Sequence, residues 1–158
     1  MHYYRRNLRL PDHDYSSYGP YFVTLITYKG QNLFGKIEND EFIYHIPELA
    51  DLFFNTYNII EDNMPGVKFF ERVTMPDHVH FIVANNTNHQ KILGDIVKEY
   101  KSIIYTGTVK LIKDGRLPEY KSKFWQRDYY EKVIMNPQSY RNYANYIRNN
   151  PKNYKKQF

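Results

Sequence analysis

The sequence contains no cysteine, which excludes disulfide bonds, thiolate metal sites and cysteine nucleophiles. It has no apolar run of the roughly 18 residues that a membrane-spanning helix needs. Its first ten residues, MHYYRRNLRL, lack the apolar stretch of a signal peptide. A glycine-rich phosphate-binding motif is also missing. We therefore expect a cytoplasmic protein that has no membrane partner and no ATP-binding loop.

Basic and aromatic residues are abundant in place of these features. The 158 residues carry a formal net charge of +5, and 18 % of them are aromatic, with 17 tyrosines. The length fits a single domain over residues 1–158 with a sizeable core. A basic, tyrosine-rich chain is typical of proteins that bind a polyanion with stackable faces, which indicates nucleic acid.

The spacing of apolar residues predicts alternating strands and helices. Strands are expected at 21–28, 67–73, 78–84 and about 131–134, and helices at 46–60, from 88 to about 106, and from 137 to about 150. The polar stretch 108–123 is predicted to be a loop. The first six elements follow the order β-α-β-β-α-β, which indicates an α+β, ferredoxin-like antiparallel sheet with an additional C-terminal helix.

His78-Val79-His80 is the sharpest local pattern in the chain. Residues i and i+2 of a strand project to the same face, so both imidazoles point together. Two adjacent imidazoles form half of a site for a divalent metal ion. The alternative is two polar residues on a solvated strand face. The preceding Asp77 is either a carboxylate that orients a ligating histidine or an ordinary turn residue.

The last predicted helix carries Tyr146 and Asn150, with Asn136 as its N-cap and Pro151 as its stop. Because Tyr146 and Asn150 are four residues apart, they lie on one side of the helix. That side is an edge of an apolar stripe formed by Tyr140, Tyr143, Ala144 and Ile147. A helix packed on the sheet would hold both side chains near a strand face. The ordinary alternatives are a packing tyrosine and a C-terminal cap.

Three blocks of sequence resemble a known family. PDHVHFIV resembles the histidine-hydrophobe-histidine motif of single-tyrosine HUH nucleases. YRRNLRLPDHDYSSYGPYFVTLITYKGQNLFGKI and WQRDYYEKVIMNPQSYRNYANYIRNNP resemble the N- and C-terminal blocks of IS200-like transposases, more narrowly of the REP-associated tyrosine transposases. The resemblance implies that His78 and His80 bind the metal ion and that Tyr146, on the additional helix, is the nucleophile. Asn150 would be the third ligand, at a position where Gln also occurs.

The chemistry that the resemblance implies is cleavage and transfer of single-stranded or hairpin DNA through a 5′-phosphotyrosine. One divalent ion, Mg²⁺ or Mn²⁺, would neutralise and orient the phosphate. A tyrosine phenol, with an ordinary pKa of about 10, must lose its proton as it attacks. The expected location is the cytoplasm of a prokaryotic cell, at the nucleoid. Each chain supplies one nucleophile, so two cleavages need either a homodimer or two rounds.

Contacts with DNA are predicted for several basic residues. Residues 1–20 are expected to form a basic, irregular arm in which Arg5, Arg6 and Arg9 lie close in sequence to Tyr3 and Tyr4. Such an arm contacts phosphates or is simply a solvated terminus. Further candidates for phosphate contacts are Lys98, Lys101 and Arg127.

Two other functions are compatible with the predicted fold. One is a non-catalytic ferredoxin-like module that stacks bases on aromatic residues of its sheet. The other is a metal-independent ribonuclease with a histidine as general base. Only the nuclease needs the histidine pair, Tyr146 and Asn150 together, and covalent trapping on a DNA strand would distinguish it.

Overall fold

The computed structural model describes residues 20–86 and 93–154, together with the backbone of residues 4–5. A five-stranded antiparallel sheet, in the order β1-β7-β2-β6-β5, lies at its centre. Its strands are β1 (Tyr4–Arg5), β2 (Tyr21–Ile26), β5 (Val67–Thr74), β6 (His78–Asn85) and β7 (Tyr130–Val133).

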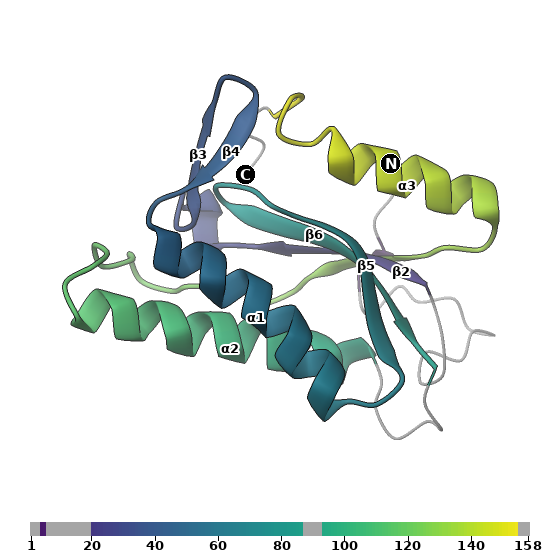
Figure 1. Cartoon of the computed structure of the whole chain (residues 1–158), viewed down its shortest axis with the longest axis horizontal. Coiled ribbons are helices and arrows are strands. Elements are labelled where there is room, and N and C mark those ends of the chain that lie inside the picture. The colour runs from purple at the N-terminus through teal and green to yellow at the C-terminus, as the bar shows by residue number, and fades with distance from the viewer. Residues whose placement is uncertain (1–3, 6–19, 87–92, 155–158) are drawn as a thin grey trace.

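The helices cover both faces of this sheet (Figure 1). Helices α1 (Pro47–Asn63) and α2 (Leu93–Lys113) lie on one face, and α3 (Pro137–Arg148) lies on the other. Numbered along the chain, β2, β5, β6 and β7 are strands 1 to 4 of a β-α-β-β-α-β unit whose spatial order is 4-1-3-2. The α+β, ferredoxin-like prediction is therefore confirmed.

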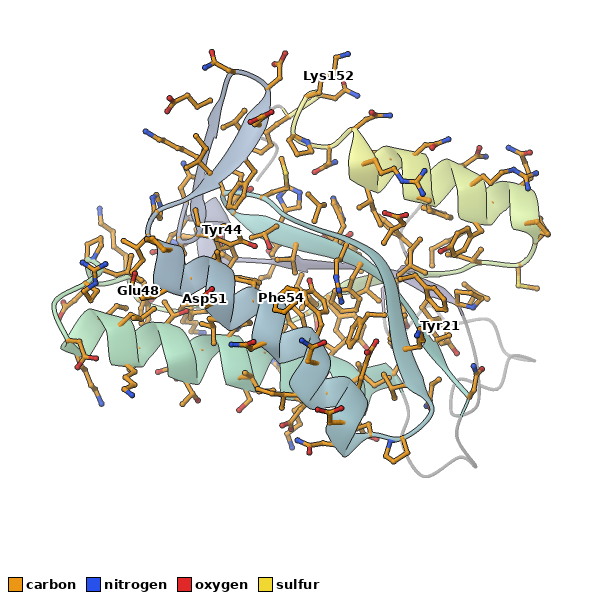
Figure 2. The ribbon with its side chains drawn as sticks, viewed as in Figure 1. Tyr21, Tyr44, Glu48, Asp51, Phe54 and Lys152 are labelled. Atoms are coloured by element: carbon orange, nitrogen blue, oxygen red, sulfur yellow. The ribbon has the colours of Figure 1, made fainter. Side chains whose placement is uncertain are left out.

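Side chains of the central strands point alternately to the two faces of the sheet, so the interior consists of two cores. Val23 and Leu25 of β2 and Val79 and Phe81 of β6 face α1 and α2 in the larger core. Side chains fill the space between these layers (Figure 2). The strand residues between them face α3, because successive side chains of a strand point to opposite faces.

The smaller core attaches α3 to the sheet. It consists of Phe22, Ile82, Ile134, Ala144 and Ile147, with three tyrosines of α3 packed against it. The predicted apolar stripe of this helix is thus the face that meets the sheet. The predicted N-cap is present as well, since the Asn136 side chain accepts a hydrogen bond from the Ser139 backbone N–H at 2.8 Å. A well-capped helix on a packed face gives its edge residues fixed positions over β6.

The prediction that residues 108–123 form a loop is wrong for the first six of them. Helix α2 continues to Lys113, and Thr108 is buried within it. The sequence is misleading here because Gly107 lies among β-branched residues with low helix propensity. Tertiary packing decides the matter: a Cβ at Gly107 would lie 2.5 Å from Cδ1 of Leu52, so glycine lets α1 and α2 approach closely.

A small hairpin lies outside the predicted elements. Strands β3 (Gly35–Glu38) and β4 (Glu41–Tyr44) pair with each other alone. Their turn has positive φ at both central residues, 53° at Asn39 and 64° at Asp40. Asn and Asp tolerate this left-handed conformation, which two-residue hairpin turns require.

The N-terminal arm is described only at Tyr4–Arg5, where the backbone pairs with β7 as β1 instead of being irregular. Arg6 and Arg9 lie outside the described residues. In the described part of the chain, none of the helices is both long and apolar enough to cross a membrane.

Candidate active site

The two histidines of β6 project together toward α3, as the strand period predicts. Their ring centroids are 4.7 Å apart, with planes at 72°. His78 is 5 % exposed and His80 is 2 % exposed. The alternative of a solvated strand face is therefore wrong, because α3 and the segment after it cover this part of β6.

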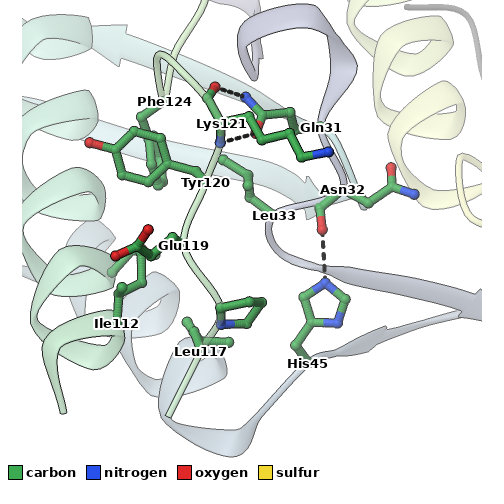
Figure 3. Close-up of a pocket in the computed structure, with 12 residues that line it drawn as sticks. Gln31, Asn32, Leu33, His45, Ile112, Leu117, Glu119, Tyr120, Lys121 and Phe124 are labelled. Carbon is green, nitrogen blue, oxygen red and sulfur yellow. Dashed lines mark hydrogen bonds between the residues drawn. The ribbon is translucent and has the colours of Figure 1, made fainter. Parts of the chain in front are cut away.

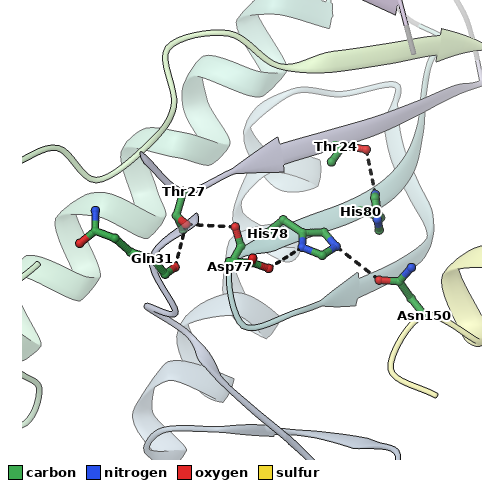
Figure 4. Close-up of polar contacts among 7 residues, drawn as sticks. All are labelled: Thr24, Thr27, Gln31, Asp77, His78, His80 and Asn150. Atoms are coloured by element: carbon green, nitrogen blue, oxygen red, sulfur yellow. Dashed lines mark hydrogen bonds and ion pairs between the residues drawn. The ribbon is translucent and has the colours of Figure 1, made fainter. Parts of the chain in front are cut away.

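Asp77 orients His78. The Nδ1 atom of His78 lies 2.8 Å from Oδ1 of Asp77, whose side chain is fully buried (Figure 4). The turn that carries Asp77 is itself held, since the Thr27 backbone N–H donates to the Asp77 carbonyl at 2.9 Å. With Nδ1 donating to the carboxylate, a neutral His78 ring directs the lone pair of Nε2 away from Asp77. This geometry favours the orienting role of Asp77 over that of a plain turn residue.

His80 is held in a similar way by β2. Its Nδ1 lies 2.8 Å from Oγ1 of Thr24, and its ring stacks on Phe22 with centroids 5.1 Å apart. Its Nε2 atom is buried and has no hydrogen-bond partner among the described residues. Burial lowers the pKa of His80 well below its ordinary value, and the charge of neighbouring His78 lowers it further. The folded protein therefore holds this ring neutral, the form that binds metal ions.

Asn150 reaches the same place from the other end of the chain. Its Oδ1 lies 3.4 Å from Nε2 of His78 (Figure 4). The helix ends slightly earlier than predicted: Asn149 is the C-cap, and Asn150 follows it with its N–H donating to the Ile147 carbonyl at 3.2 Å. An ion pair between Arg148 and Glu71 of β5 anchors this end of α3 to the sheet.

These three side chains fit a divalent metal ion. When His78 is neutral and donates from Nδ1, its Nε2 and the Asn150 Oδ1 both present lone pairs, and a cation between them would make that arrangement favourable. Ligand bonds of about 2.1 Å place two ligands of one ion roughly 3–3.5 Å apart, which agrees with the observed 3.4 Å. The described residues include no group of three His, Cys, Asp or Glu suited to a metal ion. A metal ion bound here would therefore need the amide oxygen of Asn150 in addition to the two imidazoles.

Tyr146 lies against this donor set on the edge of α3. Its ring is half-buried and meets His80 edge-on, with centroids 5.3 Å apart and planes at 66°. It also contacts Phe22 at 6.0 Å. Tyr143, one turn earlier, instead stacks on Phe22 at 4.6 Å within the smaller core. Of these two tyrosines of α3, Tyr146 is therefore the one beside the histidine pair.

Sequence reasoning missed Tyr154. The tyrosine lies beyond Pro151, but its ring is nearly parallel to that of His78, with centroids 6.4 Å apart. Burial, followed by the neighbouring Asp77 carboxylate, raises the pKa of Tyr154 to about 12. No periodic pattern includes this residue, so only the path of the chain after α3 reveals its place.

Comparison with known proteins identifies the family. The family model described as "Transposase IS200 like" matches residues 23–150, which include both histidines, Tyr146 and Asn150. The chain belongs to the IS200-like transposase family. A Haemophilus influenzae protein named only as uncharacterized is 27 % identical over 169 residues, which cover 94 % of this chain and 89 % of that protein.

Solved structures share the fold of this IS200-like transposase. A REP-associated tyrosine transposase bound to a REP hairpin has a TM-score of 0.61 and 18 % identity, over 90 % of this chain and 72 % of that one. A candidate transposase of Deinococcus radiodurans has a TM-score of 0.53 and 19 % identity, over 89 % and 97 % of the two chains. At these identities the likeness concerns the fold.

The basic residues predicted to contact DNA come from segments of the chain other than β6, the strand that carries the histidine pair. The side chains of Arg5, Arg6 and Arg9 lie outside the described residues, while Lys98 and Arg127 are exposed. Lys101 has a contact that the sequence did not indicate: its ammonium donates to the carbonyls of Gln126 at 2.9 Å and Arg127 at 3.2 Å. Burial lowers the pKa of Lys101 to about 8, opposed by Asp128. The assignment of these residues to DNA binding stays a prediction.

The buried His80 predicts acid sensitivity of the metal-free protein. Its pKa in the unfolded chain is about 6.5, and the folded value is well below this. Above about pH 6.5 the His80 ring is neutral in both the folded and the unfolded state, so its protonation does not lower the free energy of unfolding there. As the pH falls from there toward the folded pKa, the unfolded state binds more protons, and the free energy of unfolding decreases by up to about 1.4 kcal/mol per pH unit.

Thermal unfolding between pH 7.5 and 5.5 in chelator measures this effect. We expect the melting temperature of the wild type to fall more steeply with pH than that of His80→Gln. His45→Gln, a change at an exposed histidine, serves as the control. Equal slopes for the wild type and His80→Gln would show that His80 is not held neutral.

Proposed function

We propose that this IS200-like transposase cleaves and rejoins single-stranded or hairpin DNA by covalent catalysis. Tyr146 is the nucleophile, and His78, His80 and Asn150 hold one divalent ion, Mg²⁺ or Mn²⁺. The observation that carries the proposal is the meeting of β6 and the end of α3. There, Nε2 of His78 and Oδ1 of Asn150 lie 3.4 Å apart. The ring of His80, whose Nε2 has no hydrogen-bond partner among the described residues, contacts both His78 and Tyr146.

Each residue has a defined task in this reaction. Asp77 and Thr24 hold the two imidazoles, the packed face of α3 holds Tyr146, and a hydrogen bond from its backbone N–H to the Ile147 carbonyl holds Asn150 just beyond the end of that helix. The bound ion supplies charge neutralisation and orientation of the phosphate. The phenol of Tyr146 loses its proton, its oxygen bonds to phosphorus as the bond to the 3′ oxygen breaks, and the leaving 3′ oxygen takes up a proton. The products are a 5′-phosphotyrosine and a free 3′-OH, and the reverse step rejoins the strand.

The chain's charge and its solved relative support DNA as the partner. The net charge of +5 suits a polyanion, and a protein with the same fold was solved with a REP hairpin. We therefore propose membership of the REP-associated group and action on hairpin DNA in the prokaryotic cytoplasm. A homodimer and two successive rounds both remain compatible with one nucleophile per chain.

Covalent trapping on a labelled strand tests the proposal. Purified protein is incubated with hairpin DNA and Mn²⁺, denatured in SDS, and separated on a gel. Because the protein retains the 5′-phosphate of the downstream fragment, we expect a label at the 3′ end of the DNA to migrate with the protein and a label at the 5′ end to leave it. DNA binding without any adduct would instead indicate a non-catalytic binding module.

The proposed phosphate contacts predict the salt dependence of binding. Replacing Arg5, Arg6 and Arg9 with glutamine should reduce the slope of log K against log salt by about one to three units, since each contact contributes roughly 0.7–0.9. Substitution is preferable to deletion, because deletion would also remove β1 from the sheet edge. Fluorescence anisotropy at several salt concentrations provides the measurement.

A matched triple variant controls for the loss of charge. Lys36, Lys68 and Lys110 are exposed and are not assigned to DNA contacts, so their replacement with glutamine should change the slope less. Equal slopes for the two triple variants would assign the arm to another role.

A further inference from the structure

A cavity of about 300 Å³ lies away from the histidine pair. It is formed by the C-terminal half of α2, the segment 117–124 and the residues that follow the short 3₁₀ turn Tyr28–Gly30 (Figure 3). Its apolar lining comes from Leu33, Ile112, Leu117, Tyr120 and Phe124. The volume is at the lower end of the range for small-ligand sites, about 300–1,000 Å³.

Gln31 makes the cavity a preformed structure. Its side-chain Nε2 donates to the carbonyls of Lys121 at 3.0 Å and Lys123 at 2.9 Å, and its Oε1 accepts from the Lys121 N–H at 2.7 Å. In the same loop, the carbonyl of the next residue, Asn32, lies 2.9 Å from Nε2 of His45 (Figure 3). Hydrogen bonds therefore fix this loop against the segment 117–124 and against His45 before any ligand enters.

Polar groups accompany the apolar lining. Thr108 lines the cavity and is 2 % exposed, and its hydroxyl has no hydrogen-bond partner in the described part of the chain. An unpaired buried hydroxyl costs stability, which natural proteins usually avoid. The exposed Glu119 carboxylate is an acceptor in the lining. Tyr120 and Phe124 form an aromatic wall, with centroids 5.5 Å apart and planes at 85°.

Hydrogen bonds link the cavity to the turn that carries Asp77. Oγ1 of Thr27 lies 2.7 Å from the Gln31 carbonyl oxygen and 3.1 Å from the carbonyl oxygen of Asp77, the residue that orients His78 (Figure 4). The Thr27 backbone N–H also donates to the Asp77 carbonyl. Beside this link, the ammonium groups of Lys29 and Lys123 lie 5.5 Å and 5.6 Å from the centre of the Tyr28 ring. Cations therefore lie on the surface next to the cavity.

We infer that this cavity binds one unpaired nucleobase of the DNA strand whose phosphate occupies the active site. Aromatic and aliphatic walls suit the flat faces of a base, and the carboxylate of Glu119 can accept a hydrogen bond from an exocyclic amino group. Lys29 and Lys123 would contact the neighbouring phosphates. The inference rests on the proposed function for the presence of the strand and adds a specificity site to it.

An abasic scan tests the inference. The Tyr146→Phe protein, which is expected not to cleave, is titrated by fluorescence anisotropy against hairpin DNA with a single-stranded flank. One abasic residue is placed at each flank position in turn. We expect a single position at which loss of the base weakens binding by about tenfold, since the stacked base contributes directly to binding.

Two variants connect that position to the cavity. Leu117→Trp fills the cavity from a loop residue, and we expect it to abolish the effect of the abasic residue, whereas Leu111→Trp, on α2 but not in the lining, should preserve it. Glu119→Gln changes an exposed side chain and so keeps the fold. It should change the preference among the four bases at that position by about threefold or more.

Two results would overturn the inference. One is an abasic profile in which no flank position affects affinity. The other is a position-specific loss of affinity that persists in Leu117→Trp, together with an unchanged base preference in Glu119→Gln. The two failures can be told apart. Hairpin DNA that neither binds nor forms an adduct contradicts the proposed function itself. An adduct with wild-type protein and a flat abasic profile contradicts only the assignment of the cavity.

Discussion

Tyr146→Phe is expected to abolish DNA cleavage and the covalent adduct, with a fall in rate of about 10⁴-fold or more, because phenylalanine lacks the phenolic oxygen that bonds to phosphorus. The substitution removes one oxygen atom. The ring contacts with His80 and Phe22 stay in place, so melting temperature, Mn²⁺ affinity and DNA affinity should change little. Adduct formation on SDS gels and the three binding or stability measurements check this expectation.

Two other tyrosines provide matched controls. Tyr143→Phe alters the neighbouring turn of α3, and Tyr154→Phe alters the ring beside His78; both should still form the adduct. If Tyr146→Phe retains the adduct, the nucleophile lies elsewhere. Peptide mapping should then begin with Tyr154 and with Tyr130, which pairs with Thr24 across the sheet and so shares the face of the histidines.

His78→Ala is expected to lower Mn²⁺ affinity by about 100-fold or more and to eliminate cleavage. The change removes a direct ligand, whereas Asp77→Asn weakens only the group that orients it and should cost about tenfold in affinity. Cleavage by Asp77→Asn should therefore return at higher Mn²⁺, while cleavage by His78→Ala should not. Isothermal titration with Mn²⁺ and adduct formation at increasing Mn²⁺ measure the difference.

The same substitution should also affect stability, because His78 is buried and hydrogen-bonded to Asp77. Loss of that contact should cost about 1–3 kcal/mol and lower the melting temperature in chelator by about 5 °C. His45→Ala, at an exposed histidine, serves as the control. Unchanged Mn²⁺ affinity in His78→Ala would contradict the ligand assignment, and cleavage without bound metal would favour metal-independent chemistry.

Much of the fold follows from short-range patterns. Period-two alternation predicted the central strands and placed His78 and His80 on one face, since this depends only on neighbouring residues of a strand. Helical spacing predicted the packed stripe of α3, and Asn136 and Pro137 marked its start. Predictions were less accurate where packing overrides local preference. Helix α2 continues through Gly107 although glycine has low helix propensity, because close packing against Leu52 of α1 compensates for this cost.

The sequence by itself determined which side chains we propose for the chemistry: a histidine pair on one strand face, and a tyrosine followed four residues later by an amide at the end of the last helix. Only the tertiary structure decided that these two groups meet. His78 and Asn150 are 72 residues apart, and local periodicity does not specify which sheet face a helix covers. Burial of the histidines, the approach of Tyr154 and the cavity beside Thr108 depend in the same way on segments distant in the chain, because packing of the whole interior sets their positions.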